Sequence, residues 1–308
     1  MHAAQPAPAA TIQPTQRRPR AGGGPMQETE DTMQRTKTAP PESGGAQRGE
    51  RLMWLTHQRV FYAGLLGAAA ERTMGGHGVY VSPAGAPPNR LCIGGGAWQT
   101  GELLVVPPQV PHRVESAHPL ILNLLIESES VDPARMPAFM QHCGPVDAPA
   151  FVRRMRDAHV HLLAASGRGI DFDGFDFDAL FFGEPLAPRA LDARIRKVID
   201  AINADPAAPT SAEDCAASVH LSFSRFLHLF KQETGMAFRA FRAWKRSRSL
   251  LRYVRQASTL TDIALDTGYP DSTHFSHSIR QVYGLKPSDI LAGSRRLALH
   301  DAAGSFRQ

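Results

Sequence analysis

The chain has 308 residues, of which 43% are hydrophobic and 20% charged, enough for about two domains with hydrophobic cores. Its 34 Lys and Arg against 29 Asp and Glu give a net charge of +5, too small a surplus by itself to indicate a nucleic-acid partner. The longest apolar stretch, residues 120–126, is far shorter than a membrane helix, and no apolar segment near the N-terminus is typical of a secretory signal. We therefore expect a globular, cytoplasmic protein without a membrane partner.

Residues 1–50 consist mainly of Ala, Pro, Gly, Gln, Thr and charged residues, with almost no large apolar side chains. Such a segment cannot bury enough surface to offset the entropy lost on ordering, so we expect a disordered N-terminal tail. Met26, Met33 and Met53 leave open a translation start further downstream.

Residues 51–130 carry short apolar runs broken by Gly and Pro, a spacing typical of an all-β barrel or sandwich. Residues 131–188 change to a helical pattern and an Asp- and Phe-rich stretch, which we interpret as a helical and acidic connector. Residues 189–297 are expected to be helical throughout, and residues 298–308 to be a tail. The predicted fold class is therefore multidomain, with an all-β barrel plus helices on the N-terminal side and an all-α domain at the C-terminus.

The helical region contains an internal repeat. Residues 225–235 and 274–284 share the template basic-Phe-x-His-x-apolar-basic-Gln-x-x-Gly at a constant offset of 49. A capping box is expected ahead of each copy, formed by Thr210 with Glu213 and by Thr259 with Asp262. Two short helices joined by a tight turn form a helix-turn-helix unit, so the sequence predicts two such units.

A spacer, residues 238–255, joins the two units and lacks Gly and Pro, so we expect one helix of about 27 Å. Such a spacer would present both units to successive major grooves of DNA. From residue 222 to residue 256 there are nine basic residues and one acidic residue. We predict that Lys245 and Arg248 contact DNA phosphates, the alternative being an ordinary solvated helix face.

Residues 189–297 resemble the DNA-binding domain of the AraC/XylS family of bacterial transcription regulators. The resemblance rests on residues 222–235 (SFSRFLHLFKQETG), residues 262–276 (DIALDTGYPDSTHFS) and residues 284–288 (GLKPS). The sequence departs from the family pattern after Ser288, where a Tyr-Arg pair is usual, and at Ile279, where an aromatic residue is usual. The resemblance implies double-stranded DNA and RNA polymerase as partners, and a role as activator.

The residues expected to read DNA are the polar positions at the start of each second helix. In the first unit these are Ser222, Ser224, Arg225 and His228, and in the second unit Ser272, Thr273, Ser276 and His277. The resemblance to the family adds Leu227 as a base contact. His228 and His277 hold the same place in both units, which favours contact with DNA over simple solvation. The apolar positions between them are expected to form the core.

Residues 101–112 resemble the second motif of cupin barrels, with Gln109 in place of the usual Gly. A metal-dependent cupin also needs a His-x-His motif, and residues 75–100 contain only the isolated His77. The three cysteines, Cys92, Cys143 and Cys215, are too widely spaced for a metal site or a disulfide framework. We therefore expect no metal, no cofactor and no catalytic residues.

The family resemblance implies that the barrel binds a small-molecule effector and mediates dimerisation. Arg90, Trp98 and His112 are the candidate effector-binding residues, although barrel core or rim is an equally good interpretation of each. The predicted function is a sequence-specific transcription regulator that responds to an effector. Two alternatives remain open at this point: a cupin enzyme with an appended DNA-binding module, and a constitutive DNA-binding protein whose barrel only dimerises.

Overall fold

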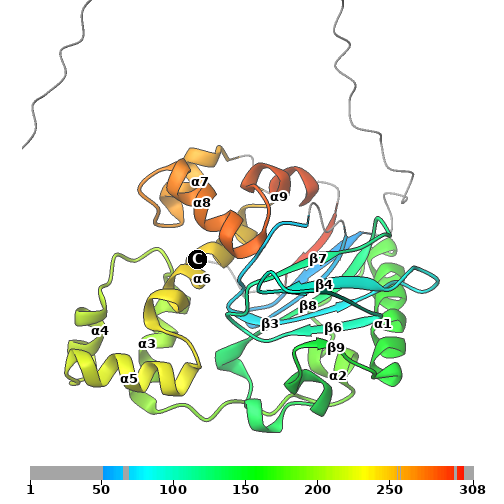
Figure 1. Cartoon of the computed structure of the whole chain (residues 1–308). Helices are drawn as coiled ribbons and strands as arrows, with labels where there is room; N and C mark the ends of the chain where they lie inside the picture. Colours follow the sequence, from blue (N-terminus) through cyan, green and yellow to red (C-terminus); the bar gives the residue numbers. More distant parts are fainter. Residues whose placement is uncertain (1–50, 65–68, 255, 257, 295–296, 302–308) are drawn as a thin grey trace, which may run out of the picture. The chain divides into compact units, whose positions relative to one another are not determined.

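The computed structural model describes residues 51–64, 69–254, 256, 258–294 and 297–301. The predicted disordered tail, residues 1–50, lies outside the described residues. The described part of the chain folds into a β-sheet region followed by a helical region (Figure 1), and the predicted fold class is confirmed to that extent.

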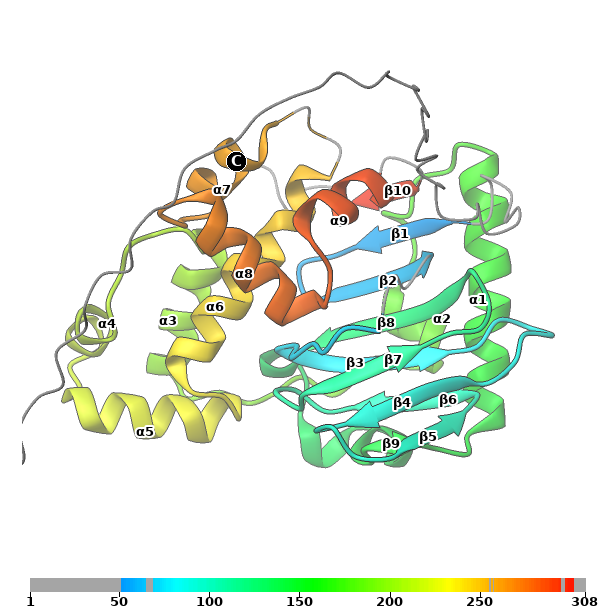
Figure 2. The same cartoon turned by 45° about the horizontal axis from the view of Figure 1, so that its top comes forward.

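The strands form two sheets within the described residues. The larger sheet has the spatial order β10-β1-β2-β8-β3-β6-β9, and the smaller one has the order β5-β4-β7 (Figure 2). The strand bounds are β1 Leu52–Leu55, β2 Arg59–Gly64, β3 Gly76–Val81, β4 Asn89–Ile93, β5 Trp98–Gly101, β6 Leu103–Val106, β7 His112–Glu115, β8 Ile121–Glu127, β9 Gly144–Pro145 and β10 Ala298–Asp301. Neighbouring strands run antiparallel except for β1 and β10, which are parallel.

The larger sheet is buried on both faces, because alternate residues along a strand point to opposite sides and each side packs into a core of its own. In β3, Val79 and Val81 pack into a core with the helices that follow the strands, whereas Tyr80 packs into a second core on the other side. The first core is formed with α1 (Pro149–Gly167) and α2 (Phe177–Phe182). The sequences of these strands are therefore continuous apolar runs, without the alternation of apolar and polar residues that a half-exposed sheet shows.

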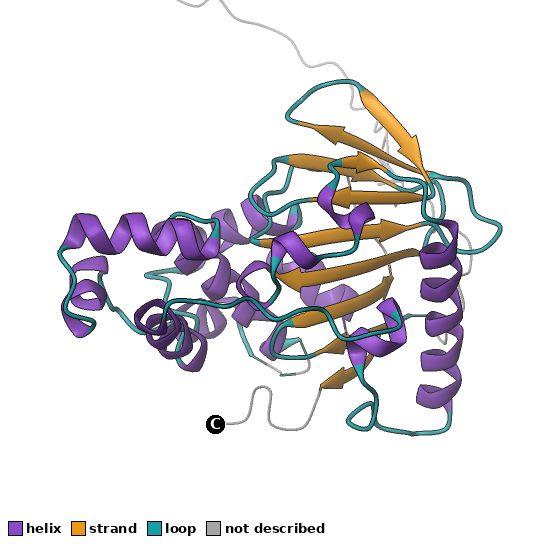
Figure 3. Cartoon of the chain, turned by 90° about the horizontal axis from the view of Figure 1, so that it is seen from below, coloured by secondary structure: helices purple, strands orange, loops and turns teal. Residues whose placement is uncertain are grey.

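The remaining helices lie in the C-terminal half of the chain. Figure 3 shows a group of helices, in purple, beside the orange strands. Their bounds are α3 Ala193–Ala204, α4 Ala212–Ser218, α5 Phe223–Thr234, α6 Phe238–Ser249, α7 Leu260–Asp266, α8 Ser272–Tyr283 and α9 Pro287–Ser294. One core joins α3, α4, α5 and the start of α6, and a smaller one joins α7 and α8 to Leu250. Each predicted helix-turn-helix unit thus has an apolar core of its own.

Two local expectations are wrong by small amounts. The first capping box is formed by Ser211 and Asp214, one residue later than expected, and the backbone carbonyl of Thr210 accepts a hydrogen bond from Arg242 at 2.8 Å. The spacer is an α-helix only to Ser249 and continues as a 3₁₀ turn over Leu250–Tyr253. The tighter turn places Leu250 in the core of the second unit.

Strands β9 and β10 join the larger sheet from segments expected to be connector and tail. Strand β10 pairs with β1 from Leu52↔Ala298 to Leu55↔Asp301. The ring of His300 stacks on Phe172 with a centroid distance of 3.6 Å, and Leu299 is buried. These contacts hold the segment against the sheet.

Helix α6 also packs against the β-sheet region. Trp244 is buried in the same core as Tyr80 and Met74. A Cβ atom added to Gly75, which precedes β3, would lie 2.2 Å from Cγ of Trp244. Only a glycine therefore lets this backbone lie against the indole ring.

We predict that Gly75→Ala destabilises the protein by about 1–3 kcal/mol, because the added methyl group overpacks this contact. The measurement is the urea midpoint of unfolding followed by circular dichroism. Gly167→Ala is the matched control, since a Cβ atom there meets nothing within 4 Å. Equal midpoints for the two variants would contradict the close packing of Trp244 on Gly75.

Candidate nucleic-acid interface

The two helix-turn-helix units repeat with one residue inserted in the second turn. Helices α4 and α7 begin 48 residues apart, whereas α5 and α8 begin 49 apart. The turns share a left-handed residue at the equivalent position, His220 with φ 55° and Gly268 with φ 80°. Glycine is required at the second turn, where a Cβ atom would lie 2.7 Å from the carbonyl oxygen of Ala207.

In the first unit, α5 presents the predicted reading positions to solvent. Ser224, Arg225 and His228 are exposed, and Leu227 is half-buried. Ser222 is the N-cap, and its hydroxyl oxygen accepts from the amide of Arg225 at 3.4 Å. The opposite face of α5 carries the buried apolar residues of the first core, so the polar residues share one free face.

In the second unit, Thr273 and His277 are exposed, and Ser272 and Ser276 are half-buried. The apolar positions of α8 point into the core of the unit, as they do in α5. The structure therefore brings the predicted readers of each unit onto one accessible helix face. Their contact with DNA remains a prediction.

Asp271 is a residue at this surface that sequence reasoning missed. Its carboxylate caps α8 by accepting from the amides of Thr273 and His274, both at 2.8 Å. It also pairs with Nδ1 of His274 at 2.8 Å. Hydrogen bonds from the amide and ring of His274 lower the pKa of this carboxyl. The signal was available, because Asp directly before a helix start is a preferred N-cap.

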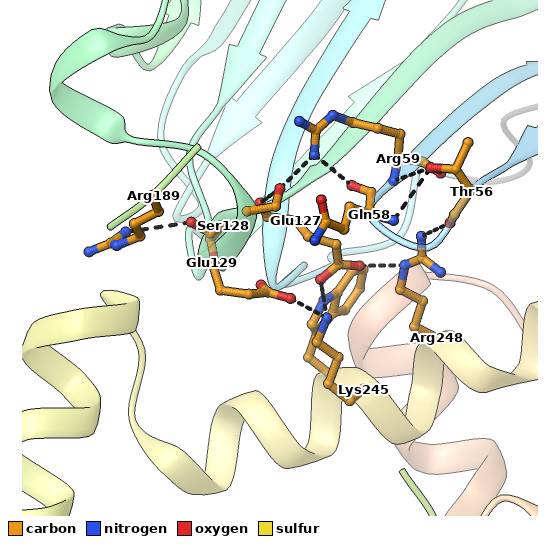
Figure 4. Close-up of polar contacts among 11 residues, drawn as sticks. Thr56, Gln58, Arg59, Glu127, Ser128, Glu129, Arg189, Lys245 and Arg248 are labelled. Atoms are coloured by element: carbon orange, nitrogen blue, oxygen red, sulfur yellow. Dashed lines mark hydrogen bonds and ion pairs between the residues drawn. The ribbon is translucent and has the colours of Figure 1, made fainter. Parts of the chain in front are cut away.

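Lys245 and Arg248 lie elsewhere than the phosphate-contact hypothesis requires. Both side chains are buried, 5% and 4% exposed, and point toward the end of β8 (Figure 4). Nζ of Lys245 donates to Oε2 of Glu127 at 2.8 Å and also pairs with Glu129. Nε of Arg248 pairs with Glu127, and its Nη2 donates to the carbonyl of Thr56 at 3.0 Å. In this arrangement neither cation is available to DNA, so the prediction is corrected.

The indole nitrogen of Trp244 completes this cluster by donating to Oε2 of Glu127 at 2.8 Å. We call Glu127, Glu129, Trp244, Lys245 and Arg248 the buried charge cluster. Three side chains of α6, those of Trp244, Lys245 and Arg248, therefore meet a carboxylate that is fully buried at the end of β8.

Opposing effects set the protonation of the buried charge cluster. Burial alone raises the pKa of the Glu127 carboxyl, but the charges of Lys245 and Arg248 outweigh burial and hold the pKa below its ordinary value. Burial lowers the pKa of the Lys245 amino group, yet the two carboxylates bring it above its ordinary value. Burial and the charge of Glu127 raise the pKa of Glu129. Glu127 is therefore the ionised partner of both cations.

Much of the remaining basic charge on α6 also has a structural role. Arg242 donates to the carbonyl of Thr210 at 2.8 Å and to that of Ala208, and Arg246 donates to the carbonyl of Pro206 at 3.2 Å. Exposed basic side chains in this region are those of Arg225, Lys231, Arg239, Arg280 and Lys286. All five lie on or beside α5 and α8 within the described residues, and their contact with phosphate is a prediction.

The structure brings Arg90 and Trp98 together but places His112 in a different, buried environment. Arg90 is exposed on β4, where its guanidinium lies 4.8 Å from the ring centroid of Trp98 and pairs with Glu115 at 2.9 Å. His112 is buried, and its Nε2 lies 2.9 Å from the hydroxyl of Tyr80. Its Nδ1 lies 2.8 Å from the carbonyl of Val110, so Nδ1 carries the proton.

Burial lowers the pKa of His112 to about 4, which keeps its imidazole neutral. A neutral, fully hydrogen-bonded imidazole inside the β-sheet region is a core residue. Arg90, by contrast, is exposed at the surface beside Trp98.

The described part of the chain contains no group of three or more His, Cys, Asp or Glu residues arranged to hold a metal ion. No helix in it is both long and apolar enough to cross a bilayer.

The helix-turn-helix geometry agrees with comparisons to known proteins. Residues 215–293 match the model of the family described as "Helix-turn-helix domain". Two curated relatives are the HTH-type transcriptional activator RhaR of Pectobacterium atrosepticum, 34% identical over 109 residues, and that of Pectobacterium carotovorum, 35% identical over the same length. The C-terminal region belongs to the AraC-type helix-turn-helix family. Each match covers 34% of this chain and only 37% of the relative.

Solved structures are also similar at low sequence identity. ToxT from Vibrio cholerae covers 77% of this chain and 97% of its own, with 11% identity and a TM-score of 0.46. The DNA-binding domain of AdpA, solved in complex with a target DNA, covers 34% of this chain and 95% of its own, with 18% identity and a TM-score of 0.32. The family assignment of the AraC-type domain rests on the sequence matches and the helix-turn-helix geometry.

We predict that Glu127→Gln destabilises the protein by about 3–5 kcal/mol, because it leaves two buried cations without their ionised partner. Glu115→Gln is the control and should cost less than about 1 kcal/mol, since its pair with Arg90 is exposed. Urea unfolding at pH 7 measures both variants.

The effect of Glu127→Gln should also depend on pH. Because folding lowers the pKa of Glu127 from 4.5, its stabilisation is present above that value and is lost as the pH falls through the folded-state pKa. The difference in unfolding free energy between parent and variant should therefore shrink below about pH 4. A constant difference from pH 7 to acid would show that Glu127 does not act as a charge.

Proposed function

We propose that this protein is a sequence-specific DNA-binding transcription regulator. The observation that carries the proposal is the duplicated helix-turn-helix unit, in which both second helices present polar side chains on a free face. The five exposed cations around these helices supply the charge that phosphate contact needs. Double-stranded DNA is therefore the proposed partner.

The direction of regulation follows from the relatives. Both curated proteins that match the AraC-type domain are called transcriptional activators, so we propose activation and a contact with RNA polymerase for this chain. The β-sheet region is proposed to bind a small effector and to support a homodimer, and the protein is proposed to act in the cytoplasm without catalytic activity or a cofactor.

Effector control needs a connection between the β-sheet region and the reading helices. The buried charge cluster and the contact of Trp244 with Gly75 make that connection on the α6 side. Ligand binding would act by favouring one of two arrangements of this contact, to the extent that it binds the two with different affinity.

The test of DNA binding begins with selection of a binding site from random duplex DNA by the full chain, followed by fluorescence anisotropy on the selected and a random duplex. We expect affinity to fall about 10³-fold or more between 50 and 200 mM salt if six or more phosphates are neutralised. A flat salt response would contradict the proposed function.

Substitutions then distinguish residues predicted to contact DNA bases from residues predicted to contact phosphates. His277→Ala should reduce the preference for the selected site over random DNA by about 5-fold or more, because a base contact is worth ~1–3 kcal/mol of discrimination. Lys286→Ala should weaken binding to both duplexes alike, because it is predicted to meet phosphate. Arg168→Ala is the charge-matched control: it removes an exposed cation at the end of α1 and should change neither affinity. If His277→Ala lowers affinity for both duplexes equally, the assignment of His277 as a reader is wrong.

A further inference from the structure

A cavity of about 420 Å³ lies outside the β-sheets, between the N-terminal half of α1, the segment after α2 and two 3₁₀ turns, Pro133–Arg135 and Ala138–Gln141. We call it the α1–α2 cavity. Its volume lies in the range of small-molecule sites. Its walls combine phenylalanine rings with charged side chains, which is the usual make-up of a site that binds an amphipathic small molecule.

Three phenylalanine rings form one apolar wall of the α1–α2 cavity. The centroids of Phe139 and Phe151 are 4.4 Å apart, and those of Phe151 and Phe182 are 5.5 Å apart with an angle of 29° between the ring planes. Phe151 is buried, whereas the outer two rings are half-buried. The row of rings is thus open to solvent at both ends, where another flat ring would continue it.

Two arginines and one glutamate supply the charge of the cavity. Arg135, Arg154 and Glu184 line it and are exposed. Within the described residues, none of these three charged groups has a hydrogen-bond or ion-pair partner in this structure. The formal charges of these three side chains add up to +1, which favours a singly charged anion over a dianion.

The guanidinium of Arg154 lies against the end of α2. Gly183 ends that helix with φ 90°, and a Cβ atom there would lie 3.0 Å from Cζ of Arg154. The absence of a side chain at Gly183 therefore makes room for the guanidinium over the C-terminus of α2. A guanidinium matches the planar geometry of a carboxylate better than any other side chain does.

We propose that the α1–α2 cavity binds a small aromatic monocarboxylate. The ring of the ligand packs beside the phenylalanine row, and its carboxylate pairs with the guanidinium of Arg154 or Arg135. Glu184 disfavours a second carboxylate on the ligand. Arg90, Trp98 and His112 do not line this cavity, so the proposed site differs from the one expected from the sequence.

The cavity wall continues into the segment that leads to the first helix-turn-helix unit. The carbonyl of Ala187, on the wall, accepts from the amide of Asp132 at 2.8 Å. Two residues later, Arg189 donates to the carbonyls of Ser128 and Gln232, each at 3.5 Å. If the proposed function holds, a ligand in this cavity would reach the DNA-binding region through these contacts.

The test measures binding of benzoate to the full chain by isothermal titration calorimetry, in the absence of DNA. We expect saturable binding, and binding of neutral benzamide that is weaker by about tenfold or more because it lacks the charge. Phthalate, with two carboxylates, should bind no better than benzoate. Absence of saturable benzoate binding, or equal binding of benzoate and benzamide, would overturn the proposal.

Variants then locate the site. Arg154→Gln and Arg135→Gln should each weaken benzoate binding, and the double variant should lose about tenfold or more. Arg153→Gln is the matched control, because Arg153 is the exposed neighbour on the same helix and does not line this cavity. Loss of binding in Arg90→Gln with full binding in the double variant would place the ligand in the β-sheet region and overturn the proposal. Since the assay contains no DNA, a failure of DNA binding leaves this result unaffected.

Discussion

The contacts between the buried carboxylate of Glu127 and helix α6 are the interactions on which the packing of the helical region against the β-sheet region depends. Glu127 ends β8, a strand in the middle of the larger sheet, and receives hydrogen bonds or ion pairs from three side chains of α6. Removing a carboxylate from water is costly, and the structure offsets that cost with two cations and an indole N–H. Because those donors all belong to one helix, the position of α6 is tied to the end of one strand.

Helix α6 in turn carries both helix-turn-helix units, but the two units are held differently. The second unit contacts the β-sheet region directly: the amide of Thr73 donates to the carbonyl of Gln281 at 2.8 Å, and a Cβ atom at Gly284 would meet the carbonyl of Ala70 at 2.9 Å. At the equivalent glycine of the first unit, Gly235, a Cβ atom would meet nothing within 4 Å. Two copies of one motif therefore experience different constraints, and the second is the more firmly fixed to the β-sheet region.

The helix-turn-helix units were predictable because their signals are local. Ser222 and Thr259 cap helices as expected, and Gly235 and Gly284 end helices in the left-handed conformation that only glycine adopts freely. The first capping box was misplaced by one residue because Thr210 and Ser211 can both cap, and Glu213 and Asp214 can both reach back. In the structure Ser211 and Asp214 form the box.

The buried contacts of Lys245 and Arg248 could not be predicted from the sequence around these two residues. A basic residue on a polar helix has the same sequence signature whether it faces DNA or a buried acid. The deciding partner, Glu127, lies 118 residues from Lys245 in the chain and ends a strand whose apolar run gives no sign of a polar contact. The same reasoning applies to the α1–α2 cavity, whose walls come from three separate segments.

The pairing of β10 with β1 has a consequence for biosynthesis. The first and last described strands of the chain are neighbours in one sheet, so this edge of β1 lacks β10 until the ribosome has completed both helix-turn-helix units. A parallel strand pair between segments so far apart in the sequence forms late and slowly during folding. During translation the nascent β-sheet region thus exposes an unpaired strand edge, the kind of surface that chaperones shield and that neighbouring chains can capture.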